Sequence, residues 1–201
     1  MPMQNTTLAR QHADPFPLLD DIVVLADAAM RAEAPARIVE RLAAGLRDLL
    51  AGHDEAPLPA WLLDGAPEGY VRRELYRSRS HGYQIVAITW APGQGSPVHD
   101  HGDTWGIEAL LRGRLEVVDY RVVARHRALA ELRPATSHTL EPGTVIGLLP
   151  PHDLHACRNA SARETAVSLH VYGRALDAVK RYAQVGDALY RPQRIRLAVV
   201  D

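Results

Sequence analysis

The distribution of apolar residues changes along the chain from helical spacing to strand spacing. Between Pro17 and Gly52, apolar residues recur every three or four positions in two segments, residues 18–26 and 38–50. Pro35 near the start of the second segment and Gly52 just after it are common helix start and stop signals. We therefore predict two amphipathic helices, which are too small to bury a core of their own and should pack against the structure that follows.

After Tyr70 the apolar residues form short runs rich in β-branched and aromatic side chains, separated by glycine and proline. The predicted strands are residues 74–77, 83–90, 115–123, 136–140, 144–149, 165–172 and 194–200. Residues 54–67, rich in proline and glycine, are expected to form a linker, and residues 175–182 a short helical turn. Many short strands with little helix between them favour an antiparallel sandwich or jelly roll.

We expect one structural domain, in which residues 1–68 supply the helices and linker and residues 69–201 supply the barrel. The formal net charge is −1, which gives no electrostatic reason to expect a nucleic acid or an anionic membrane as partner. No apolar run approaches the ~20 residues of a membrane span, and residues 1–10 lack the features of a signal peptide. Cys157 is the only cysteine, so an internal disulfide is excluded, as is usual in a reducing compartment. Together these observations indicate a cytoplasmic protein.

Two histidines separated by one residue, His99 and His101, are the strongest chemical signal in the chain. If this segment is a strand, both imidazoles lie on one face, because strand side chains alternate with a period of two. Imidazole is the commonest protein ligand of metal ions. The pair therefore indicates one side of a mononuclear metal site; the alternative is a pair of exposed loop histidines.

Two motifs that contain histidine resemble those of the cupin superfamily. They are Gly93-x5-His99-x-His101-x4-Gly106-x6-Gly113 and Pro150-x-His152-x2-His155-x3-Asn159. The resemblance implies a mainly β fold, the cupin double-stranded β-helix or jelly roll, with an N-terminal helical segment. It also implies a metal inside the barrel, bound by His99, His101 and His155. Gly106 occupies the position of the usual metal-binding glutamate, so this ligand set is three neutral histidines without a carboxylate.

Two further residues are alternative candidates for metal ligands. Glu108 follows Gly106 by two positions and could replace the missing carboxylate, although it lies seven residues beyond His101. His152 could replace His155, but the His155-x3-Asn159 spacing matches the second motif better. His152 is then expected to be an exposed turn residue.

Three stretches narrow the resemblance to the cysteine dioxygenase type I family of thiol dioxygenases. They are residues 90–101, Trp105-Gly106 and Ser168-Leu-His170-Val-Tyr172. The resemblance implies Fe(2+) held by three histidines, a small thiol and O2 as partners, and a sulfinate as product. Three neutral ligands leave the ion with its full charge and with open coordination positions, so a thiolate substrate can supply the anionic donor.

Ser168, His170 and Tyr172 alternate along a predicted strand and therefore share one face, where they can form a hydrogen-bonded row. By the resemblance, Tyr172 donates a hydrogen bond near substrate and oxygen, and Ser168 orients His170. In the alternative, three inward polar side chains only satisfy one another. Some family members link this tyrosine to a cysteine by a thioether. Gly106 holds the matching position, so we expect no such crosslink and expect Cys157 to be a small buried side chain.

Two arginines are candidates for binding a substrate carboxylate. By the resemblance, Arg72 in Tyr70-Val-Arg72 matches the arginine of cysteine dioxygenases, and Arg181, nine residues after Tyr172, matches that of 3-mercaptopropionate dioxygenases. The planar guanidinium group suits bidentate binding of a carboxylate. The neighbouring cations that would fit a one-residue shift are Arg73, Arg77 and Lys180.

The sequence thus predicts a thiol dioxygenase that acts on a small thiol carboxylate such as cysteine, 3-mercaptopropionate or mercaptosuccinate. One alternative is a three-histidine cupin dioxygenase that acts on carbon, and another is a non-catalytic cupin that binds a metal or small ligand. A neutral lipophilic substrate needs no carboxylate-binding arginine, which counts against the first alternative. The second lacks support from any DNA-binding motif or basic stretch that would indicate a sensor.

Overall fold

The computed structural model describes residues 14–52 and 56–198. The helices are α1 (Leu19–Ala29), α2 (Pro35–Ala51) and the short 3-10 helix η2 (Ala60–Leu63). The strands are β1 (Val71–Arg77), β2 (Gln84–Trp90), β3 (Val98–His99), β4 (Gly106–Arg112), β5 (Leu115–His126), β6 (Leu129–Leu140), β7 (Val145–Leu148), β8 (His155–Arg158), β9 (Ala166–Tyr172), β10 (Ala178–Gln184) and β11 (Leu189–Arg196). The two predicted amphipathic helices are confirmed. None of the described helices has the length and apolar composition needed to span a membrane.

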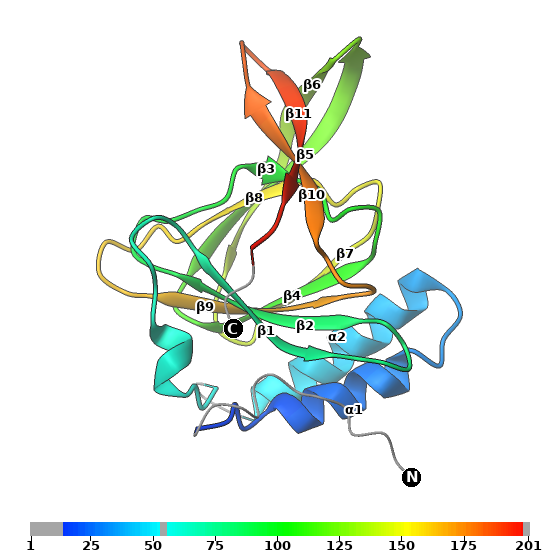
Figure 1. Cartoon of the computed structure of the whole chain (residues 1–201), viewed down its shortest axis with the longest axis vertical. Helices are drawn as coiled ribbons and strands as arrows, with labels where there is room; N and C mark the ends of the chain where they lie inside the picture. The colour runs from blue at the N-terminus through cyan, green and yellow to red at the C-terminus, as the bar shows by residue number, and fades with distance from the viewer. Residues whose placement is uncertain (1–13, 53–55, 199–201) are drawn as a thin grey trace.

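The strands form two antiparallel sheets (Figure 1). The first has the strand order β1-β2-β9-β4-β7, and in the second the strands β10-β11-β6-β5-β8-β3 pair in a closed ring. Neighbouring strands in both sheets are mostly distant in the sequence, as in a jelly roll. The expected mainly β cupin fold with an N-terminal helical segment is confirmed.

The first sheet is covered on both faces, so that β2 and β9 are buried at every position. Along β9, Leu169 packs in one core cluster with the helices, whereas Ala166 and Tyr172 pack in a second cluster with residues of the other sheet. Because strand side chains alternate, Ser168 and His170 also face the second sheet. The helices therefore cover the outer face of the first sheet (Figure 1), and the polar residues of β9 point into the barrel. The division of the chain at residues 68 and 69 stays a prediction.

Three strands of the second sheet form a short ladder that positions residues of the barrel interior. β3 pairs with β10 and with β8, so His99 lies opposite Arg181 on one side and opposite His155 on the other. Directly opposed residues of antiparallel strands point to the same face of the sheet, with Cα atoms ~4.5–5.5 Å apart. We call this arrangement the β8–β3–β10 ladder; it places the three side chains side by side.

The helical turn predicted for residues 175–182 is wrong, because this segment enters β10. Two buried residues of the strand, Val179 and Tyr182, are three positions apart, which is helical spacing, but each is buried in a different core cluster, on opposite faces of the strand. Pairing with β11 and β3 satisfies the backbone and overrides the local pattern. The last strand begins earlier than predicted, at Leu189, and ends at Arg196; residues 199 and 200 of that prediction lie outside the described residues.

The sequence pattern does not predict β3, β4 and β8. Gly106 and Glu108 interrupt the apolar run of β4, and β3 and β8, with two and four residues, are too short to show an alternation. The predicted linker also contributes to the hydrophobic core, because Leu62 of η2 is buried beneath the first sheet.

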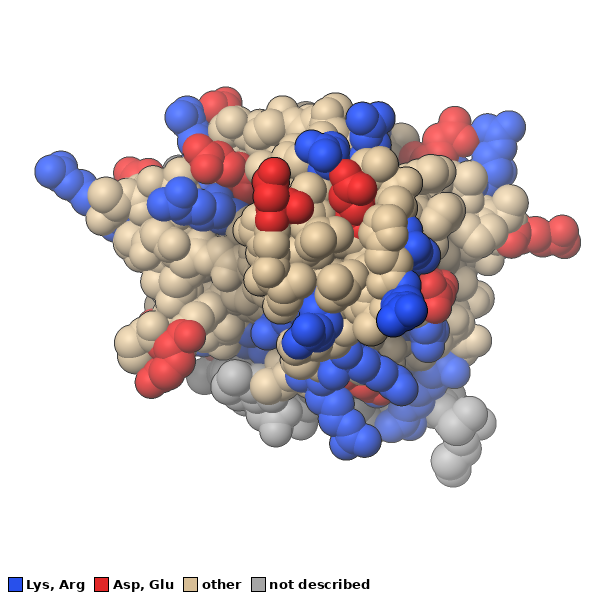
Figure 2. Space-filling model, turned by 90° about the horizontal axis from the view of Figure 1, so that it is seen from above, with Lys and Arg blue, Asp and Glu red and all other residues tan. Residues whose placement is uncertain are grey.

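The hairpins β5–β6 and β10–β11 project from the end of the barrel opposite the helices (Figure 1). Viewed from that end, acidic and basic side chains are interspersed over most of the surface, and basic side chains gather along one edge (Figure 2). The mixture of both signs on this face matches the small net charge of the chain.

Candidate functional site

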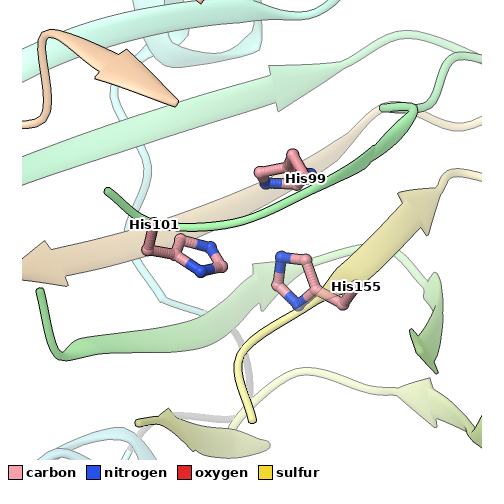
Figure 3. Close-up of side chains that lie close together, drawn as sticks. All are labelled: His99, His101 and His155. Atoms are coloured by element: carbon pink, nitrogen blue, oxygen red, sulfur yellow. The ribbon is translucent and has the colours of Figure 1, made fainter. Parts of the chain in front are cut away.

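Three histidines converge inside the barrel, and we call them the three-histidine cluster (Figure 3). His99 comes from β3, His101 from the loop after it, and His155 from the start of β8. The ring centroids are 5.1 Å apart for His99 and His101 and 4.8 Å apart for each of the other two pairs. One ring nitrogen of each histidine lies within 4.8 Å of one from each of the others. All three can therefore reach one metal ion.

The structure brings His99 and His101 together, but not by the strand alternation considered from the sequence, because His101 lies outside the strand. β3 ends at His99 and the chain then turns. The backbone N–H of His101 donates to Oδ2 of Asp153 (3.0 Å), and the same oxygen lies 3.1 Å from Nδ1 of the ring. Asp153, rather than strand pairing, therefore orients His101.

Asp153 is a site residue that the sequence reasoning missed. It is 5 % exposed. Burial acts to raise the pKa of its carboxyl group, but the hydrogen bonds from His101 outweigh burial and leave that pKa below its ordinary value. The carboxylate is therefore ionised and accepts the Nδ1 proton of His101. Its position two residues before His155 is the signal by which it could have been found.

The hydrogen bonding of the rings fits a metal ion. Because Nδ1 of His101 donates to Asp153, Nε2 carries the lone pair, and this buried atom has no hydrogen-bond partner among the described residues. Nδ1 of His99 faces the Pro97 carbonyl oxygen at 3.0 Å, which likewise leaves Nε2 as the lone-pair nitrogen. Burial, together with the neighbouring His101, lowers the pKa of His99 to about 3 and that of His155 well below its ordinary value. Both rings are thus neutral at pH 7, which is the form that binds metals.

Ser168, His170 and Tyr172 form the predicted hydrogen-bonded row on β9. Nε2 of His170 lies 2.8 Å from Oγ of Ser168, and Nδ1 lies 3.1 Å from the Tyr172 hydroxyl oxygen. Nε1 of Trp90 donates to Ser168 (2.9 Å), a contact that the sequence reasoning missed. Burial, together with the neighbouring His101, holds the pKa of His170 well below its ordinary value, and burial raises the pKa of Tyr172. The rings of Tyr172 and His101 are 5.9 Å apart, so the row lies beside the three-histidine cluster.

A pocket inside the barrel is lined by His99, His155 and Tyr172. Arg72 on β1 lines the same pocket and is 5 % exposed. Neither Nη1 nor Nη2 hydrogen-bonds to another described residue. An unpaired buried charge costs several kcal/mol, on the order of 2–5, so a guanidinium in this state marks a position where an anion binds. Arg181 of β10 lines the pocket too, but its Nη2 donates to the Tyr70 hydroxyl oxygen (3.0 Å).

The pocket that contains these arginines is small, with a cavity volume of ≈ 20 Å³. A single water molecule needs roughly 10–15 Å³ by the same measure, so only a small molecule enters without movement of the walls. Its other polar lining residues include His99, His155, His170 and Tyr172.

The three other cations that the sequence left open have partners outside the pocket. Arg73 donates to Thr89 Oγ1 (2.9 Å) and to the carbonyl oxygen of Asp64 (2.6 Å). The remaining ion pairs are Arg77 with Glu74 and Lys180 with Asp100. The structure therefore brings only Arg72 and Arg181, of these five described cations, to the pocket. His152 is exposed in the turn before β8.

Glu108 and Cys157 lie beside each other inside the barrel. Glu108 is opposite His170 in the pairing of β4 with β9 and is 0 % exposed. Sγ of Cys157 lies 3.8 and 3.9 Å from the two carboxylate oxygens of Glu108 and 3.8 Å from Nε2 of His155. Burial raises the pKa of Glu108 to about 7 and that of Cys157 well above its ordinary value. The prediction that Cys157 is a buried side chain is confirmed.

Gly106 lies opposite Tyr172 in the same pair of strands. A Cβ atom at Gly106 would lie 3.2 Å from Cδ1 of the tyrosine ring. The position that the resemblance matches to the crosslinking cysteine thus borders the tyrosine directly, whereas the single cysteine of this chain is on β8.

Comparison with known sequences identifies relatives of this chain. The family model described as "Cysteine dioxygenase type I" matches residues 13–185. Cysteine dioxygenase type 1 from Danio rerio is 26% identical over 112 residues, and that from Rattus norvegicus is 27% identical over 114 residues. Each alignment covers 56% of this chain and 55% of the relative, so the chain spans about half the length of the curated relatives it matches.

Two solved structures are similar to parts of the chain. TT1209 from Thermus thermophilus shares 24% identity with a TM-score of 0.41 and covers 56% of this chain and 90% of its own. An oxalate oxidase in complex with the substrate analogue glycolate shares 17% identity with a TM-score of 0.43 and covers 58% and 59%, respectively. The family match is far longer and includes both helices, the three-histidine cluster and the row on β9. On that match, the chain belongs to the cysteine dioxygenase type I family.

Proposed function

We propose that this protein is an iron(II)-dependent thiol dioxygenase, which adds both atoms of O2 to the sulfur of a small thiol carboxylate and releases a sulfinate. The family supports the reaction class, and the three-histidine cluster supports a metal site. The observation that carries the substrate class is the buried Arg72 guanidinium, which has no partner among the described residues and lies in the same pocket. We assign the reaction to the cytoplasm, because a thiol substrate and an unpaired cysteine both fit a reducing compartment.

His99, His101 and His155 would hold the ion through neutral ring nitrogens. When bound, a ferrous ion supplies the redox chemistry that joins O2 to sulfur. Because the three ligands carry no charge, an anionic sulfur is a favourable partner for the site. The contribution of the protein is to leave coordination positions open and to present the thiolate and its carboxylate in one orientation.

Arg72 is the better of the two arginines for the substrate carboxylate. Its two terminal nitrogens are unpaired among the described residues, and a carboxylate satisfies both by a bidentate pair of charge-assisted hydrogen bonds. Arg181 already donates to Tyr70, so it has less to gain. A monocarboxylate such as cysteine or 3-mercaptopropionate therefore binds Arg72, and a second acidic group, as in mercaptosuccinate, would turn to Arg181.

The row on β9 delivers a hydrogen-bond donor to the pocket. Trp90 donates to the Ser168 oxygen, so the Ser168 hydroxyl proton is left to point at Nε2 of His170. A neutral His170 that accepts at Nε2 carries its proton on Nδ1 and donates it to the Tyr172 oxygen. The Tyr172 hydroxyl proton is then free to point into the pocket. Its raised pKa keeps that proton in place at neutral pH.

Pocket size argues against a substrate oxidised at carbon. A diketone or flavonol is much larger than a cavity of ≈ 20 Å³ allows, and it offers no anion to Arg72. A small thiol acid needs far less movement of the pocket walls than these substrates and supplies an anion to Arg72.

The proposal is tested by oxygen uptake with ferrous-loaded protein. Cysteine, 3-mercaptopropionate and mercaptosuccinate should consume O2 with formation of a sulfinate that carries two labelled oxygens from 18O2. Cysteamine, which has the thiol but no carboxylate, should react much more slowly at equal concentration. Absence of uptake with every thiol, or a product with one labelled oxygen, would overturn the proposed reaction, and equal rates for cysteamine would overturn the role of Arg72.

A further inference from the structure

A second set of buried metal-ligating side chains lies beside the three-histidine cluster. It consists of Glu108, His155 and Cys157, whose ligand atoms all lie within 4.8 Å of one another. Their exposed fractions are 0, 1 and 3 %. We propose that these residues form a second metal site, suited to a thiophilic divalent ion such as Zn2+, which shares His155 with the three-histidine cluster and competes with it.

The distances between the ligand atoms are close to those of a tetrahedral zinc site. Metal–sulfur bonds of ~2.3 Å and metal–nitrogen or metal–oxygen bonds of ~2.0–2.2 Å, at tetrahedral angles, place ligand atoms ~3.3–3.6 Å apart. Cys157 Sγ lies 3.8 Å from His155 Nε2 and 3.8 and 3.9 Å from the Glu108 oxygens. The contacts of Sγ are therefore within a few tenths of an ångström of a coordination shell, and the Glu108 oxygen and the His155 nitrogen, which lie within 4.8 Å of each other, would also have to approach.

The chemistry of the two sets differs. A thiolate, an imidazole and a carboxylate together favour Zn2+, whereas the three-histidine cluster offers nitrogen alone. Cys157 and His155 both line the substrate pocket, so an ion can reach them and its fourth ligand can come from the pocket side. The second site is therefore accessible by the route that the substrate would use.

The polar atoms of the second set lack good partners without an ion. The partners that the structure gives the Glu108 carboxylate are the Cys157 thiol, which is a weak donor, and His170 Nε2 at 4.0 Å. The neighbour that the structure gives Nε2 of His155 within this set is the same thiol, at 3.8 Å. A carboxyl group and a thiol buried together are costly to desolvate, and a divalent ion would use both.

Sharing of His155 makes the two sites mutually exclusive. An ion held by Glu108 and Cys157 withdraws an imidazole from the three-histidine cluster, so zinc at this site blocks the loading of iron. This inference concerns metal binding alone and stands whether or not the protein oxidises thiols.

Cys157 is the only cysteine of the chain, so any metal–sulfur signal must come from it. Full-length protein loaded with one equivalent of Zn2+, in buffer without thiol reductants, is measured by X-ray absorption at the zinc edge. One sulfur at ~2.3 Å is expected, and Co2+ should give a thiolate-to-metal charge-transfer band in the near ultraviolet. A shell of nitrogen and oxygen only, with no charge-transfer band, overturns the proposal, and this test needs no variant.

Variants separate the ligands. Cys157→Ser should abolish the sulfur signal and weaken Zn2+ binding by about tenfold or more, and Glu108→Gln should weaken binding while it keeps the sulfur signal. His99→Ala is the matched control, because it removes a ligand of the three-histidine cluster alone and should keep both the signal and the zinc affinity. Unchanged zinc affinity in folded Cys157→Ser, or loss of the sulfur signal in His99→Ala, contradicts the second site.

Discussion

Replacement of Arg72 by methionine should make the protein more stable and less active at the same time. Arg72 is 5 % exposed, and its terminal nitrogens have no partner among the described residues. In the absence of substrate this buried charge is a cost that an apolar side chain of similar length removes. Exchange of even paired buried charges for apolar groups of similar volume is neutral or stabilises proteins by about 1–4 kcal/mol. We expect a gain of about 1–3 kcal/mol, which raises the melting temperature by ~2–4 °C per kcal/mol in a chain of this size.

The same substitution removes the partner of the substrate carboxylate. Loss of one member of a buried charge pair costs about 2–5 kcal/mol. At 1.36 kcal/mol per tenfold change, kcat/KM for cysteine or 3-mercaptopropionate should fall by a factor of ~30 to several thousand. The rate with cysteamine should hardly change. Oxygen uptake and thermal unfolding, measured on the same preparation, give both quantities.

Arg73→Met is the matched control for Arg72→Met. Arg73 is the next residue on β1, but its guanidinium is satisfied by Thr89 and by the carbonyl oxygen of Asp64. This variant should lose stability and keep kcat/KM. The reasoning is refuted if Arg72→Met is destabilised like the control, or if it retains full kcat/KM for a thiol acid.

Three other substitutions test the site and the fold. Asp153→Asn replaces the charged acceptor that orients His101 with a neutral amide, so the affinity for Fe(2+) should fall by about 10–100-fold in a chelator competition assay. The folded-state pKa of His170 lies below its unfolded value, so the unfolded chain takes up a proton that the folded chain does not, and stability is lost as the pH falls below ~6.5. His99 and His155, whose pKa values are lowered in the same way, also contribute to this loss in metal-free protein. Denaturant titrations should therefore show His170→Asn losing stability less steeply than the wild type, by about 1.4 kcal/mol per pH unit. Gly113 has a φ of 78°, and its Cβ would lie 2.9 Å from Cα of Ala166, so Gly113→Ala should cost about 1–3 kcal/mol, clearly more than Gly143→Ala, where φ is 85° and no atom lies within 4 Å.

The features of the fold that could be predicted from the sequence are those encoded by local periodicity. The two helices have amphipathic spacing, and β2 and β9 are long runs of strand-forming residues. β10 was open to misinterpretation because Val179 and Tyr182 are buried on opposite faces by different clusters. A strand buried alternately on its two faces can imitate helical spacing, and only tertiary pairing distinguishes the two.

The residues of the candidate site also fall into those that a local sequence pattern predicts and those that it does not. His99, His101, His155 and the row on β9 stand in recognisable spacings, and the structure brings them together. Trp90 acts through a contact with Ser168 that joins distant segments, so no local pattern reveals it. Asp153 contacts the distant His101, and its position two residues before His155 is its one local signal. The inward position of Glu108 depends on the alternation of β4, which Gly106 obscures. Sequence thus predicts the side chains that share a motif better than those that support them from elsewhere in the chain.

Backbone pairing in the β8–β3–β10 ladder fixes the distance between the metal ligands and Arg181. His155, His99 and Arg181 stand on successive strands of one register, so the span from the metal ligands to this cation equals whole interstrand steps. A slip of β10 by one residue would turn Arg181 to the other face and bring Lys180 or Tyr182 into its place. The distance between the thiol and carboxylate groups of an acid that reaches both the metal site and Arg181 is therefore set by the spacing of the strands. Relatives that evolve toward longer or shorter substrates would have to change the register of a sheet, whereas a change of one side chain would alter only how tightly a given length is held.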